Sequence, residues 1–140
     1  LEDSSRIPGG IYTEEASRRT FERLAELTRL LLRQGYVVIA DATFLRRPHR
    51  QPMIGVAEEV GAPWRILSLQ ATEAVLTQRV RRRAEARGDA SEATVEVLRR
   101  QLEEQEPFDE LEAGHILAFD GNDDRHWPAR IAELQREFAT

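Results

Sequence analysis

An α/β fold built on a parallel sheet is what this sequence predicts, and two observations lead there. Amphipathic helical segments alternate with short apolar runs along the 140 residues. Such alternation is typical of strands that are joined by helices and lie parallel in one sheet. The runs are apolar without interruption, as strands buried on both faces of a parallel sheet are. The length favours a single domain over residues 1–140.

The first helix is predicted to follow Thr13, a favourable N-cap residue with glutamates in the turn after it. Apolar side chains then recur at helical spacing until Gly35 ends the helix. Residues 36–40 form an apolar, β-branched run that predicts a strand. Beyond them the predicted elements are helices over about 48–60, 72–88, 91–106 and 127–138, with strands over about 64–69 and 115–119.

Composition excludes several classes of protein. The chain has no cysteine, so it can hold neither a disulfide framework nor a thiolate metal site. Its longest apolar runs are far shorter than the roughly 20 residues that span a bilayer. A net charge of −5 argues against nucleic acid as a partner, because phosphate contacts need accumulated lysine and arginine. A polar N-terminal stretch without a signal peptide favours the cytoplasm.

The polar turn after the 36–40 run carries the first candidate site residues. Ligands of open parallel sheets bind at the carboxyl ends of the strands, where Asp41 and Thr43 stand. The Asp41 carboxylate could hold Mg²⁺ through water or accept a hydrogen bond from a substrate hydroxyl; alternatively, it caps the turn. Arg50 is the candidate phosphate-binding residue of the next helix, because a bound anion would offset the cost of a cation near that helix N-terminus.

The second candidate group is a row of arginines on the 72–88 helix. Arg79, Arg83 and Arg87 recur every four residues and therefore share one face, where they repel one another. A polyphosphate is a natural counter-charge for them, and arginines that reach a transferring phosphoryl group accelerate its transfer. The alternative is a solvated helix face. The two helices spanning about 72–106 would form a lid that closes over a nucleotide.

These segments together resemble a known family. The motifs that carry the resemblance are "VVIADATF" at 37–44, Arg50, and "RVRRRAEARGDAS" at 79–91, with the long helix before them and the glutamine-bearing helix after them. They are similar to the predicted P-loop kinases of the zeta-toxin-like and polynucleotide-kinase-like group. In particular, they resemble the ATP-binding domain that is fused behind an aminoglycoside-phosphotransferase-like domain in many bacterial proteins. The resemblance covers residues 6–125.

The resemblance implies a three-layer α/β/α fold with a parallel sheet, and phosphoryl transfer from ATP with Mg²⁺ to a hydroxyl of a small molecule. Asp41 would lie near Mg²⁺ and the acceptor. Arg79 and Arg83, together with Arg87, would be lid arginines that contact the phosphates.

The sequence departs from this family in one respect. No GxxxxGK[ST] motif occurs in it, and Gly9 and Gly10 stand without the lysine and hydroxyl residue that follow in such a loop. We therefore expect the C-terminal part of a kinase domain, without its first strand and phosphate-binding loop, inactive alone. Two alternatives stay open: a non-catalytic nucleotide- or anion-binding module of a larger protein, and a structural fragment whose arginine face pairs with an acidic partner.

Overall fold

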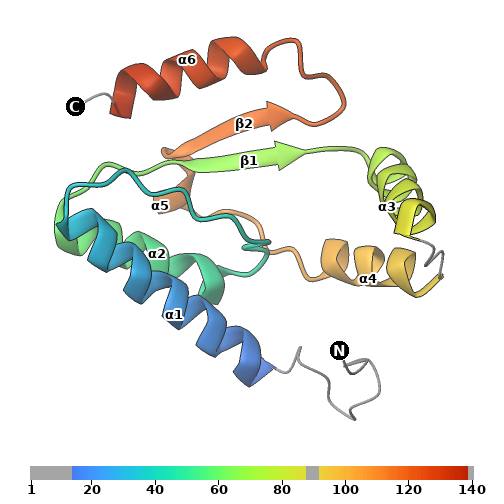
Figure 1. Ribbon diagram of the computed structural model, residues 1–140, viewed down its shortest axis with the longest axis horizontal. Coiled ribbons are helices and arrows are strands. Elements are labelled where there is room, and N and C mark those ends of the chain that lie inside the picture. The colour runs from blue at the N-terminus through green and yellow to red at the C-terminus, as the bar shows by residue number, and fades with distance from the viewer. Residues whose placement is uncertain (1–13, 88–91, 139–140) are drawn as a thin grey trace. The chain divides into compact units, whose positions relative to one another are not determined.

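The computed structural model of the chain describes residues 14–87 and 92–138 (Figure 1). It divides between Pro63 and Trp64 into two compact units. The first unit contains two helices, and the second contains the strands and the remaining helices.

The first unit is a pair of packed helices, α1 (Glu14–Arg33) and α2 (Arg47–Val60). Phe21, Ala25 and Thr28 are buried on α1, and their spacing of four and three residues places them on one face. The buried side chains of α2 are Arg50, Ile54, Val56 and Ala57. Both helices lie close to their predicted bounds, since amphipathic periodicity of this length is a strong helical signal.

Ion pairs connect the same two helices near their C-terminal ends. Arg29 Nε and Arg33 Nη2 of α1 donate to the two carboxylate oxygens of Glu59 at 3.0 and 2.7 Å. Helix α2 then ends at Gly61, whose φ of 72° lies in the left-handed region that glycine adopts without steric cost.

The prediction of a strand over residues 36–40 is wrong. The structure forms no strand there, and Val37 and Ile39 are 62% and 83% exposed. A β-branched apolar run becomes a strand only when a neighbouring strand accepts and donates its backbone hydrogen bonds. Among the described residues no such neighbour pairs with this segment.

The second unit contains the sheet, which consists of β1 (Ile66–Gln70) and β2 (Ile116–Asp120) within the part of the chain that is described. The strands are parallel, with Ile66 opposite Ile116 and Gln70 opposite Asp120. The prediction of an α/β fold with parallel strands is thereby confirmed. Helix α6 (Trp127–Phe138) packs on β2, as Figure 1 shows.

The core of this unit lies where β2 meets α6. Leu117 and Phe119 of β2 are buried, and the indole ring of Trp127 meets the Phe119 ring edge-on at 5.5 Å between centroids. Parallel strands are normally covered on both faces, but the side chains of Leu67 and Leu69 on β1 are 41% and 66% exposed.

Three more helices complete the second unit: α3 (Glu73–Arg87), α4 (Glu92–Glu103) and α5 (Glu110–Ala113). Helices α3 and α4 pack against each other, and α4 ends three residues earlier than expected. The sequence reading did not anticipate α5, a single turn closed by a capping box between Asp109 and Glu112. Residues 88–91 between α3 and α4, which fall within the predicted lid, lie outside the described residues.

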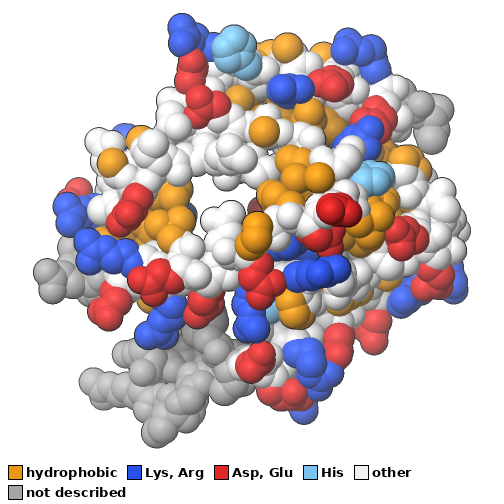
Figure 2. All heavy atoms as spheres, turned by 180° about the vertical axis from the view of Figure 1, so that it is seen from behind, with side chains coloured by type: hydrophobic (Ala, Val, Ile, Leu, Met, Phe, Trp, Pro, Cys, Tyr) orange, Lys and Arg blue, Asp and Glu red, His pale blue; other side chains and the backbone are white. Residues whose placement is uncertain are grey.

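No helix in the described ranges is long and apolar enough to cross a membrane. On the face shown in Figure 2, acidic and basic side chains are interspersed, with apolar side chains exposed between them.

Candidate functional site

The carboxyl ends of β1 and β2 approach each other closely at Gly121. Its backbone N–H donates to the carbonyl oxygen of Gln70 at 2.5 Å. A Cβ atom at Gly121 would lie 2.8 Å from that oxygen and 3.1 Å from the Cβ of Ala71. A side chain would therefore push the two strand ends apart, so glycine is what allows this approach.

Asn122 joins the same edge of the sheet to the start of α3. Its side-chain oxygen Oδ1 accepts a hydrogen bond from the backbone N–H of Thr72 at 3.1 Å. Its own backbone N–H and its Nδ2 donate to Oδ1 of Asp120 at 2.8 and 2.9 Å. The loop after β2 is thus fixed beside the residue that precedes α3.

Arg79 lies at this junction. Its Nη2 donates to the carbonyl oxygen of Gly121 at 2.6 Å, which holds the guanidinium group at the carboxyl end of β2. Arg83 follows one helical turn later on the same face of α3 and is exposed. Within the described ranges no carboxylate forms an ion pair with Arg83. Arg87 ends α3, and its side chain lies outside the described part of the structure.

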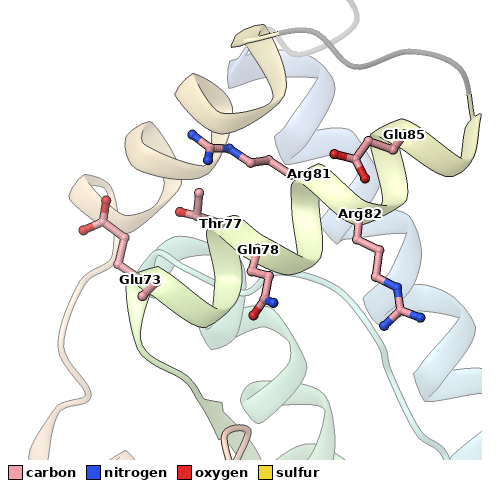
Figure 3. Close-up of a pocket in the computed structure, with 7 residues that line it drawn as sticks. Glu73, Thr77, Gln78, Arg81, Arg82 and Glu85 are labelled. Atoms are coloured by element: carbon pink, nitrogen blue, oxygen red, sulfur yellow. The ribbon is translucent and has the colours of Figure 1, made fainter.

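A different face of α3 borders an open hollow of about 920 Å³ (Figure 3). Seven side chains line it, and those of Arg81 and Arg82 point away from each other. The hollow is lined by Glu73, Ala74, Thr77, Gln78, Arg81, Arg82 and Glu85. Charges of both signs thus line it in equal number, which selects no single class of ligand.

The polar turn that follows residues 36–40, called the acidic turn below because it contains Asp41, belongs to the first unit. Asp41 and Thr43 are exposed there, and the turn closes at Phe44, whose φ of 44° is unusual for a residue with a side chain. Arg50 is only 4% exposed, and its Nη1 donates to the carbonyl oxygens of Phe44 and Leu45 at 3.3 and 3.1 Å. The structure therefore directs Arg50 towards the backbone of the turn.

The turn could hold a magnesium ion only in a site with few protein ligands. No group of three or more His, Asp or Glu side chains that could hold a metal occurs among the residues described. Mg²⁺ often binds through one or two carboxylates and keeps several waters, so the single exposed carboxylate of Asp41 fits such a site.

The structure thus groups Asp41, Thr43 and Arg50 in the first unit, and Arg79 and Arg83 in the second. Sequence reasoning missed the residues that Gly121 and Asn122 contact. The Asp-Gly-Asn sequence signals a turn. It does not show that Gln70 and Thr72, about 50 residues earlier, lie against that turn.

One comparison with known proteins gives a match. A family model described as an AAA domain matches residues 2–108, a segment that includes every predicted site residue. Neither the curated proteins nor the solved structures contain a match to the chain.

Proposed function

Because the chain belongs to the AAA domain family of P-loop NTPase-like proteins, we propose that it is the lid-bearing part of an ATP-dependent small-molecule kinase. Membership confirms the resemblance and the α/β P-loop fold that the sequence predicted. At the family level, the function is that of a nucleotide-binding domain. The kinase activity, the acceptor and the roles of individual residues are our proposal.

The observation that carries the proposal is the position of the α3 arginines. Arg79 is anchored at the carboxyl end of β2, the edge at which open parallel sheets bind ligands. Arg83 extends the same face by one turn, exposed and without a described carboxylate partner. Guanidinium groups bind phosphate oxygens through bidentate hydrogen bonds, so this face suits the phosphates of a nucleotide.

In the first unit, Asp41 is the candidate group for Mg²⁺ or for the acceptor hydroxyl. An exposed carboxylate in a turn after an apolar segment can orient water around Mg²⁺ or accept a hydrogen bond from an acceptor hydroxyl. Thr43, two residues later, offers a hydroxyl group to the same ligand. Bound ATP and Mg²⁺ would supply the phosphoryl group and neutralise its developing charge.

The absence of a GxxxxGK[ST] motif from the 140 residues limits what this chain does by itself. That loop cradles the phosphates with backbone N–H groups and a lysine, and its hydroxyl residue holds the metal. We therefore expect this chain to bind ATP weakly and not to transfer its phosphoryl group. A non-catalytic nucleotide-binding module would also bind ATP weakly. The two functions differ when the chain is combined with a GxxxxGK[ST] loop: a kinase would then transfer the phosphoryl group, and a binding module would not.

Calorimetric titration with ATP and Mg²⁺ tests the proposal. Arg83→Ala should weaken ATP binding by about 10- to 150-fold, since a charge-assisted hydrogen bond contributes about 1.5–3 kcal/mol. Arg82→Ala is the matched control: it removes an exposed arginine from another face of α3 and should change the affinity little. Equal effects of both substitutions, or no binding by the unmodified chain, would contradict the proposed phosphate site.

A further inference from the structure

The junction between the acidic turn and α2 is held by a buried cation. Arg50 is 4% exposed, and one of its terminal nitrogens, Nη1, donates to two successive carbonyl oxygens, those of Phe44 and Leu45. The N-cap residue of α2, Arg46, makes no side-chain capping hydrogen bond. A turn that enters a helix without a side-chain cap depends on other groups to fix its backbone.

The backbone at Phe44 needs such support. Its φ of 44° places a bulky residue in the left-handed region, where the Cβ atom crowds the following carbonyl group. Conformations of this kind persist only where the surroundings over-determine them. Here the Phe44 ring packs on Phe21 of α1, with 5.3 Å between centroids, and Arg50 binds the carbonyl oxygen.

We propose that Arg50 is a positioning residue for Asp41 and Thr43 and does not itself contact a phosphate. Its hydrogen bonds to these two carbonyl oxygens hold Phe44 and Leu45, and with them the direction in which the preceding turn presents Asp41. The Phe21 ring contacts the same turn through the Phe44 ring. This inference rests on the proposed function only for the role of Asp41; the effect of Arg50 on the turn is independent of any ligand.

Nuclear magnetic resonance of the turn tests the structural half of the inference. Arg50→Met keeps the aliphatic stem but removes the donors, so the amide shifts of residues 41–45 should change and the contacts between the Phe21 and Phe44 rings should be lost. Asp41→Asn, which changes the sequence of the turn but keeps Arg50, should leave the contacts between the Phe21 and Phe44 rings unchanged. If Arg50→Met folds with the turn signals of the unmodified chain, Arg50 does not position the turn and the inference is overturned.

Arg50→Lys keeps the test decisive if Arg50→Met fails to fold. Lysine retains the charge and a donor group at shorter reach, so it should restore part of the turn signals. The ATP affinity of each variant should then depend on whether its turn is intact: a variant with the turn signals of the unmodified chain should bind ATP as tightly as that chain does. A lysine variant that has normal turn signals but binds ATP about tenfold more weakly would make Arg50 a direct phosphate ligand.

Calorimetry separates this inference from the proposed function. In the presence of Mg²⁺, Arg50→Met and Asp41→Asn should weaken ATP binding by similar factors, and the double variant should lose little more, because both act through one group. Additive losses would mean that Arg50 acts separately from Asp41. If the unmodified chain binds no ATP, the proposed function fails, while the turn signals still decide the role of Arg50.

Discussion

At the scale of single residues, the loop after β2 contains a carboxylate whose charged form is stabilised mainly by Arg125. Oδ1 of Asp123 accepts from the Nε and the backbone N–H of Arg125 at 2.8 and 3.1 Å. Oδ2 accepts from Nη2 of the same residue at 2.5 Å. The guanidinium group first, and the backbone N–H second, hold the pKa of Asp123 below its ordinary value, because both favour the carboxylate.

Arg125→Ala should therefore raise the pKa of Asp123 towards its ordinary value, as followed by the carboxyl resonance in a pH titration. A pKa lowered by folding contributes stability that is complete above the unfolded-state pKa and is lost as pH falls through the folded-state pKa. The pair is exposed, so the contribution to stability is small. Arg130→Ala on α6 is the control and should leave the Asp123 titration unchanged; a shift in both variants would contradict a local cause.

At the scale of helices and strands, glycine at position 121 lets β1 and β2 end in contact. A methyl group there would meet the Gln70 carbonyl oxygen at 2.8 Å, a backbone atom that cannot turn aside. Gly121→Ala should destabilise the second unit by about 1–3 kcal/mol, the usual cost of overpacking. Urea unfolding, monitored by tryptophan fluorescence from Trp64 and Trp127 of that unit, measures the change.

Gly114 provides the matched control for that substitution. Its φ of −71° suits any residue, and a Cβ atom there would have no neighbour within 4 Å. Gly114→Ala should therefore be neutral or slightly stabilising, because alanine restricts the unfolded chain more than glycine does. Equal midpoints for the Gly121 and Gly114 variants would rule out the close approach of the two strand ends.

The same scale shows which elements a sequence can predict. The long helices were predicted well because amphipathic periodicity and their start and stop signals act within a few residues, as at Gly61. The strand over residues 36–40 failed because pairing depends on a distant partner. Helix α5 was missed because four residues are too few to show a period, although Asp109 and Glu112 have capping-box spacing.

The candidate site divides in the same way. Sequence reasoning proposed Asp41 from its place after an apolar run, and Arg79 and Arg83 from their spacing. It did not find that Arg79 is anchored on the Gly121 carbonyl group or that Arg50 is buried against the turn at Phe44. Both contacts are made to backbone carbonyl oxygens, which every residue carries, so residue types cannot reveal them.

At the scale of the whole molecule, the described chain exposes large apolar side chains in both units. Single exposed apolar residues are normal on protein surfaces. Here, however, Tyr36, Val37 and Ile39 lie within four residues of one another and are 61%, 62% and 83% exposed. Leu69 on β1 is 66% exposed. Exposed apolar groups of this kind bind hydrophobic dyes and other apolar surfaces.

The folded chain should therefore enhance the fluorescence of anilinonaphthalene sulfonate under native conditions. Ile39→Lys should reduce that enhancement without lowering the unfolding midpoint, since the Ile39 side chain is already largely in water. Leu117→Lys, at a site only 9% exposed, should instead unfold the second unit, because a lysine charge cannot be buried there without a partner. If the folded chain binds no dye, or if Ile39→Lys unfolds it, then residues 36–40 are covered in solution. They would then pair with another strand, as the sequence predicted.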